Sequence, residues 1–210
     1  MDVQVIDFIF SVAVLIMSVV IHEVSHGFVA DSMGDPTARY QGRLTLNPIK
    51  HLDPMGSVLV PAITYFLGGF IFGWAKPVPY NPYNLKNQKW GPAIVAGAGP
   101  FSNFLVAIVF GLAVRFAEHL AIPAAFVQVA VMVVFINIIL MIFNLVPIPP
   151  LDGSKILFAL LPVRFYYIQR FLEQYGFFLV IIFIFFFWSL ILPLVRVLFN
   201  IITGIGISGF

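Results

Sequence analysis

Hydrophobic residues are concentrated in five long stretches of the chain, near residues 3–21, 55–74, 91–114, 121–147 and 176–202. A helix of about 20 apolar residues spans the hydrocarbon core of a bilayer. Helices and closed barrels are the structures that satisfy the backbone in lipid, and these stretches do not alternate as barrel strands do. The pattern therefore predicts an all-α polytopic membrane protein with four to six transmembrane helices.

The segment at residues 36–50 has a different pattern. Tyr40, Leu44 and Leu46 alternate with polar residues, and Gly42 lies among them. Alternation around a glycine is typical of short strands joined by a turn. We therefore expect a short β-like hairpin or extended segment beside the membrane, after the first helix.

The positions of lysine and arginine bear on the second apolar stretch, 55–74. Cytoplasmic loops collect these residues. If the stretch crossed the membrane, the basic residues before and after it would face opposite sides. If it dips in and returns, nine of the eleven lysines and arginines face the cytoplasm, namely Arg39, Arg43, Lys50, Lys76, Lys86, Lys89, Lys155, Arg164 and Arg170. Pro61, Gly68, Gly69 and Gly73 also favour a re-entrant element, with a glycine-rich spanning helix as the alternative.

The amino-acid composition also indicates a membrane protein, and it limits which residues can bind a metal. The chain has 210 residues, 61% hydrophobic and 10% charged, whereas a soluble domain carries about 25% charged residues. A net charge of +2 without a basic patch argues against nucleic-acid binding, and the lack of cysteine leaves His, Asp and Glu as metal ligands. We predict one domain over residues 1–210, with helices at about 3–30, 91–117, 121–147 and 174–203 and a hairpin or re-entrant element at 36–75.

The first apolar stretch ends in the sequence HEVSH, residues 22–26. The spacing places the imidazoles of His22 and His26 on one helical face, where they can share a zinc ion. Glu23 lies beside the first histidine and can act as general base toward the attacking water. Ionisable groups at bilayer depth are costly and usually mark function. A hydrogen-bonded histidine pair in a helix bundle is the alternative.

A catalytic zinc site normally takes a third protein ligand. Ser32 occupies the position where one class of HExxH enzymes has its third histidine, which leaves His51, Asp53 and Asp152 as candidates. Asp152 follows the fourth apolar stretch within FNLVPIPPLDG, whose prolines and glycine favour an unwound segment. If 55–74 returns to its own side, this carboxylate and the HEVSH end of the first helix lie at the same depth, which favours Asp152.

These residues resemble the site-2 protease family of intramembrane zinc metalloproteases. The resemblance rests on HEVSH at 22–26 and NLVPIPPLDG at 144–153. Weaker elements are GAGPFSN at 97–103 and LNPIKHLDPMG at 46–56. Nearly the whole chain is covered, and we expect the minimal form of the family, without the PDZ or CBS domain of larger members.

The resemblance implies Zn2+ as cofactor, with His22, His26 and Asp152 as its ligands and Glu23 as the catalytic base. It also implies a re-entrant element between the HExxH helix and the next helix, in line with the basic residues. We interpret His51 and Asp53 as loop structure, with a role in gating or supporting the site as the alternative, and assign no role to His119.

Two asparagines at lipid depth are candidates for substrate contact. Asn103 and Asn144 could hold a substrate strand or help stabilise the developing oxyanion. Hydrogen bonding between helices is an equally good reading of both residues, and we favour it for Asn137.

The predicted function is hydrolysis of peptide bonds within or next to transmembrane segments of membrane proteins, as in regulated intramembrane proteolysis. The family suggests membrane-bound anti-sigma factors, transcription factors or remnant signal peptides as substrates. We expect a multi-pass protein in the lipid bilayer of a prokaryotic inner membrane, with the active site toward the cytoplasm. The alternative is a metal transporter or sensor that uses the same ligands, although such a protein does not need Glu23. The sequence makes no prediction of oligomeric state.

Overall fold

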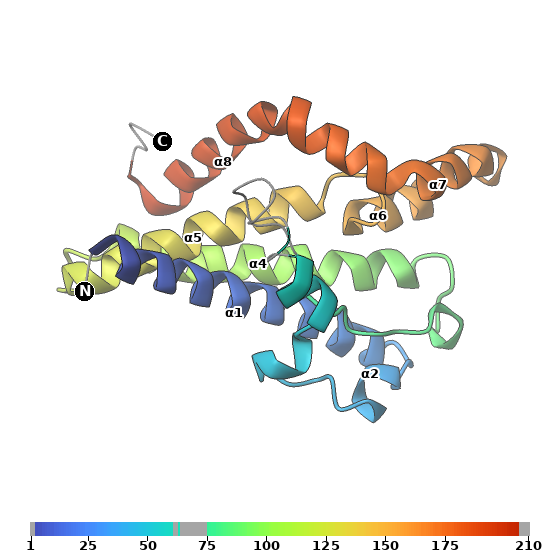
Figure 1. The fold of residues 1–210 in the computed structure, drawn as a ribbon, viewed down its shortest axis with the longest axis horizontal. Helices are drawn as coiled ribbons and strands as arrows, with labels where there is room; N and C mark the ends of the chain where they lie inside the picture. Colours follow the sequence, from blue (N-terminus) through green and yellow to red (C-terminus); the bar gives the residue numbers. More distant parts are fainter. Residues whose placement is uncertain (1–2, 61–62, 64–74, 206–210) are drawn as a thin grey trace.

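The computed structural model describes residues 3–60, 63 and 75–205, and the regular elements within these ranges are helices (Figure 1). Four helical runs there are long and apolar enough to cross a membrane. They are α1 (Val3–Ser32), α4 (Gly91–Arg115), α5 (Ala124–Asn144) and the continuous run of α7 (Tyr166–Ile182), η5 (Phe183–Phe187) and α8 (Trp188–Thr203). The prediction of a helical protein with several helices long and apolar enough to span a membrane is confirmed for the described residues.

Helix α4 lies lengthwise between α1 and α5 and contacts both, while α8 packs across α4 and α5 (Figure 1). Small residues allow this close approach, as is usual between membrane helices. A Cβ at Gly111 of α4 would lie 2.2 Å from a side-chain carbon of Ile202 in α8. Ala107, Val134 and Val195 from α4, α5 and α8 are fully buried at the centre of this packing.

A buried polar network joins the first three spanning helices. The Asn103 side-chain amide of α4 donates to Asn137 Oδ1 of α5 at 2.8 Å, and Asn137 Nδ2 donates to Ser18 Oγ of α1, also at 2.8 Å. Without water in the hydrocarbon, each of these groups needs a protein partner. The network therefore fixes how α1, α4 and α5 face one another.

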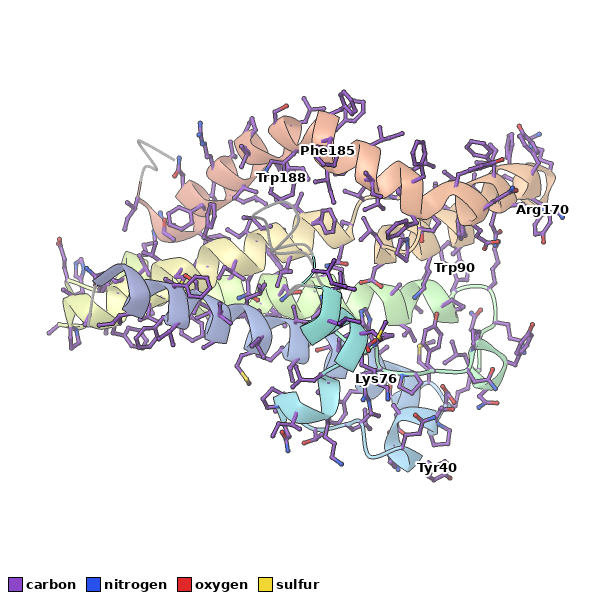
Figure 2. All side chains as sticks on the ribbon, viewed as in Figure 1. Tyr40, Lys76, Trp90, Arg170, Phe185 and Trp188 are labelled. Atoms are coloured by element: carbon purple, nitrogen blue, oxygen red, sulfur yellow. The ribbon has the colours of Figure 1, made fainter. Side chains whose placement is uncertain are left out.

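The C-terminal helical run is longer than a bilayer is thick. Its 38 residues correspond to about 57 Å of helix, against about 30 Å of hydrocarbon. The run bends at η5, and Pro193 interrupts the hydrogen bonding of α8. Phe185 projects outward and is 78% exposed, while the Trp188 ring packs 6.3 Å from Phe143 of α5 (Figure 2). The exposed phenylalanines suit contact with lipid.

The end of α1 and the start of α4 meet at one end of the bundle. The Lys86 amide donates to the Met33 carbonyl at 3.0 Å, and Leu85 packs with Ala30 of α1 and Val95 of α4. The turn between α5 and α7 lies at the same end (Figure 1). The segments before and after 55–74 are therefore held together at this end of the bundle.

The predicted hairpin at 36–50 is not supported. The described residues there form a short helix, α2 (Thr37–Tyr40), and a 3₁₀ turn, η1 (Pro48–His51). Proline at the first position of η1 suits a helical turn because its missing N–H needs no partner. The Asn47 side chain also accepts the Ile49 amide at 3.0 Å, which caps the turn. Local capping thus overrides the alternating pattern.

The predicted re-entrant stretch 55–74 lies mostly outside the described residues. Its beginning is a helical turn, η2 (Pro54–Leu59), capped by the Asp53 side chain, which accepts the Met55 amide at 3.0 Å. Asp53 therefore acts as a cap here.

Asp35 fastens the chain just after α1 to the segment before α4. It is fully buried and accepts hydrogen bonds from Thr37 Oγ1 at 2.6 Å, the Asn81 amide at 2.6 Å and Asn84 Nδ2 at 2.8 Å. Burial raises the pKa of the Asp35 carboxyl, but these hydrogen bonds outweigh it and hold the pKa below its ordinary value.

We expect Asp35→Asn to lower the free energy of unfolding by about 1–3 kcal/mol at pH 7, because the amide cannot accept all of these donors. The wild-type carboxylate stabilises the fold above its unfolded-state pKa of about 3.9, and this contribution is lost as the pH falls through the lower folded-state pKa. Thermal unfolding of both proteins in detergent, at pH 7 and at about pH 3, tests this. A stability difference of the same size at both pH values would contradict the assignment.

Candidate metal centre

Two histidines of α1 and one aspartate of α6 (Asp152–Leu160) converge at one point. The rings of His22 and His26, one helical turn apart, have centroids 4.7 Å from each other. Asp152 Oδ2 lies 3.0 Å from His22 Nε2 and 3.2 Å from His26 Nε2. Within the described part of the chain, these residues form the group that is close enough to share a metal ion.

The proline-rich turn after α5 brings Asp152 to this point. The chain leaves α5 at Asn144 and begins α6 at Asp152. A Cβ at Gly153 would lie 2.2 Å from the Leu145 carbonyl oxygen, so a side chain there would push the two helix ends apart. Gly153 thus lets α6 start directly against the end of α5.

Hydrogen bonds assign the tautomer of both imidazoles. His22 Nδ1 lies 2.6 Å from Asn103 Oδ1, and His26 Nδ1 lies 2.7 Å from the Val95 carbonyl oxygen. Both partners are acceptors, because the Asn103 amide nitrogen is already bonded to Asn137 and to the Ser18 carbonyl. Each Nδ1 therefore carries the proton, as in metal sites whose histidines are oriented by a second group.

The position of these protons decides whether the three side chains can bind a metal ion. With Nδ1 protonated, the Nε2 atoms of neutral His22 and His26 present lone pairs toward the carboxylate of Asp152. Asp152 Oδ2 lies 3.0 Å from one Nε2 lone pair and 3.2 Å from the other. Without a proton between them, these electron pairs repel one another unless a cation joins them. The nitrogen and oxygen donors are ones that zinc accepts.

A glycine of α4 makes room for the two rings. A Cβ at Gly99 would lie 2.5 Å from Nε2 of both His22 and His26. Sequence reasoning treated GAGPFSN only as a weak family element and missed this contact. The available signal was the glycine inside a helical pattern, which often marks a close approach.

Glu23 shares a polar cavity of about 150 Å³ with the cluster. Its Oε2 accepts a hydrogen bond from the Val78 amide at 2.8 Å. The cavity is lined by His22, Glu23, His26, Pro77, Val78, Tyr80, Val95, Asn144, Pro150, Asp152 and Lys155. No sequence motif marks Val78, Tyr80 or Lys155 as part of the site.

The two candidate asparagines lie at different distances from the cavity. Asn144 lines the cavity, whereas Asn103 is fully buried behind His22. The predicted roles of both in substrate or oxyanion binding stay predictions.

His51 is 1% exposed, and its Nε2 lies 2.8 Å from the Thr45 carbonyl oxygen, away from the cluster. His119 packs edge-on against Phe116 after the end of α4.

Membrane-length helices around a HExxH pair and a distant aspartate define the class of membrane-embedded metalloproteases. The model of peptidase family M50 matches residues 114–187, which include Asp152. With a relative 42% identical over 79% of the chain, this match shows that the chain belongs to peptidase family M50, the site-2 protease family. The resemblance seen in the motifs is confirmed.

The relatives come from bacteria. "Putative zinc metalloprotease YwhC" of Bacillus subtilis (strain 168) is 42% identical over 174 residues, which cover 79% of this chain and 75% of that protein. "Putative zinc metalloprotease Rip2" of Mycolicibacterium smegmatis is 34% identical over 179 residues, 83% of this chain and 66% of that protein. Rip2 of Mycobacterium tuberculosis (strain H37Rv) is 29% identical over 146 residues, 70% of this chain and 55% of that protein. No solved structure matches the chain.

We expect Gly99→Ala to weaken zinc binding about 10- to 100-fold, as loss of a group that orients metal ligands does. The added methyl group would displace both imidazoles from the positions that face Asp152. Zinc titration of the purified protein against a chelator of known affinity measures the change.

Gly97→Ala is the matched control for this experiment. Gly97 lies two residues away on α4, and a Cβ there meets nothing within 4 Å. We expect it to bind zinc as the wild type does. Equal zinc affinity of both alanine variants would show that α4 does not set the spacing of the histidines.

Proposed function

We propose that the protein is a zinc metalloendopeptidase that hydrolyses peptide bonds within or next to transmembrane segments of other membrane proteins. The observation that carries the proposal is the convergence of His22, His26 and Asp152 beside Glu23 on a membrane-length helix. The names of the bacterial relatives, which describe zinc metalloproteases, support the choice of metal.

His22, His26 and Asp152 would hold the zinc. When bound, zinc supplies Lewis-acid polarisation of the scissile carbonyl and makes water more acidic. The protein's own contribution is to present both Nε2 atoms: Asn103 Oδ1 and the Val95 carbonyl keep the two Nδ1 atoms protonated. This arrangement holds the rings in a single orientation before any substrate arrives.

Glu23 would move the proton. Its carboxylate shares the cavity with the three ligands and is held at Oε2 by the Val78 amide. It would accept the proton of the attacking water and pass it to the leaving amine. Asn144 also lines the cavity and is our candidate for a hydrogen bond to the substrate backbone or the developing oxyanion.

The cavity volume bears on the form of the substrate. At about 150 Å³, it is smaller than the roughly 300–1,000 Å³ of small-molecule sites. A transmembrane helix also hides its carbonyl groups in hydrogen bonds. We infer that a substrate is cut in a locally unwound, extended form. Membrane-bound anti-sigma factors, transcription factors and remnant signal peptides are the substrate classes we propose.

The distribution of charge supports an active site toward the cytoplasm. The nine basic residues lie in the segments after α1, before α4 and between the end of α5 and the first turns of α7. Lysine and arginine accumulate on the cytoplasmic side of membrane proteins. Together with the bacterial origin of the relatives, this supports our proposal that the protein lies in the inner membrane.

We expect Glu23→Gln to keep its zinc and to lose about 100- to 10,000-fold in proteolytic rate, the contribution of a general base. The amide keeps the size and the hydrogen bond to Val78 but cannot accept the proton. The measurement compares the termini of membrane proteins in cells that produce the wild type or the variant, together with zinc content. New termini inside hydrophobic segments that require Glu23 would name the substrates.

Identical termini in both cell lines, with both proteins zinc-loaded, would overturn the protease proposal. A metal transporter that uses the same ligands would then be the better reading. Zinc uptake by vesicles containing the purified protein would test that reading directly.

A further inference from the structure

An irregular segment, KPVPY at residues 76–80, covers one side of the metal-site cavity, and we refer to it as the 76–80 strap. Figure 2 labels Lys76 at its beginning, beside the bundle. Two of its five residues are prolines, which restrict the backbone and remove N–H donors. The Lys76 amide donates to the His51 carbonyl at 2.9 Å, and the Val78 amide donates to Glu23 Oε2 at 2.8 Å.

The side chains of the strap also hold it against the site. Val78 is 5% exposed, and a Cβ at Gly27 of α1 would lie 2.8 Å from Val78 Cγ1. Val78 thus sits on the glycine that follows the HEVSH motif. At the other end of the strap, the Lys155 ammonium of α6 lies 5.3 Å from the centroid of the Tyr80 ring, a cation–π contact. The strap therefore bridges the two helices that carry the cluster.

Arg43 fastens this strap to the loop before it. The side chain of Arg43 is buried, and its Nη2 donates to the Lys76 carbonyl at 2.8 Å and to the Pro77 carbonyl at 3.2 Å. Its Nη1 donates to the Lys50 carbonyl. A guanidinium is costly to bury without such bonds. Its planar fork can hold carbonyls of two segments at once, which an ammonium cannot do in the same way.

We propose that Arg43 is a positioning residue of the active site. It holds the Lys76 and Pro77 carbonyls, keeps the 76–80 strap seated on α1, and so directs the Val78 amide onto the Glu23 carboxylate. Arg43 contacts neither the metal ligands nor the cavity, and it acts through the strap. The inference deepens the proposed function, on which it rests, because Glu23 matters as a base only if the site cleaves peptides.

The chain contains no cysteine, so a single introduced thiol can report on the strap. In Val78→Cys, the new thiol is buried against Gly27 and reacts slowly with a maleimide in detergent. Adding Arg43→Met should raise its labelling rate about tenfold or more, the effect expected when hydrogen bonds to a charged group are lost. Arg43→Lys, which keeps the charge and part of the hydrogen bonding, should give an intermediate rate.

Two controls separate a released strap from a damaged fold. Arg39→Met removes an arginine from the same part of the chain, but Arg39 is exposed and pairs with Asp31. It should leave the labelling rate of Val78→Cys unchanged. Val195→Cys places the reporter in the fully buried core between α4, α5 and α8. It should stay protected in the Arg43→Met background.

Activity and zinc content complete the test, in proteins without the reporter cysteines. In Arg43→Met we expect kcat for a transmembrane substrate to fall about tenfold, as for a misplaced catalytic group, with zinc content unchanged and with partial rescue by Arg43→Lys. Unchanged labelling of Val78→Cys, or loss of zinc together with exposure of Val195→Cys, would overturn the proposal.

The labelling experiment measures how well the 76–80 strap is held in place, and it does not depend on catalytic activity. A wild type that shows no proteolysis, combined with Arg43-dependent protection of Val78→Cys, would overturn the proposed function. It would still support the hold of Arg43 on the strap.

Discussion

The interior of a bilayer provides no water, so a polar group placed there must find its partner within the protein. In this chain that requirement fixes how the helices face one another. Ser18, Asn137 and Asn103 form a buried series across α1, α5 and α4, and the series ends on Nδ1 of His22. The bonds that satisfy the helix packing thus also set the orientation of His22, a candidate metal ligand. The candidate metal centre and the fold share one set of hydrogen bonds.

Glycines allow the close contacts between the segments that surround the site. Gly99 lets α4 pass against both imidazoles, and Gly153 lets α6 start against the end of α5. Gly27 provides the floor on which Val78 rests. Each is placed next to a residue of the cluster in the sequence or in space. These glycines therefore allow the close packing that the cluster needs, while the histidines and carboxylates beside them provide its chemistry.

Sequence reasoning succeeded where a feature is local or strongly periodic. The spanning stretches could be found from the length of their apolar runs, and the shared face of the i, i+4 histidines follows from helical spacing. Asp152 required an additional argument, in which the basic residues placed two distant segments at one end of the bundle. The hairpin at 36–50 failed because Tyr40 and Leu46 are exposed, so the alternation does not mark a buried face. The contacts of Arg43 and Gly99 join segments far apart in sequence. A glycine inside a helix can signal a close approach, but a single sequence does not identify the partner on the other side.

The separation of the ligands along the chain has a consequence for biosynthesis. His22 and Asp152 are 130 residues apart, and membrane proteins are made and folded from the N-terminus onward. Helix α1 leaves the ribosome with both imidazoles long before the carboxylate exists. Helix α4, which supplies Gly99 and Asn103, arrives in between. A nascent chain therefore carries an incomplete candidate centre, which can assemble only after most of the protein has been synthesised.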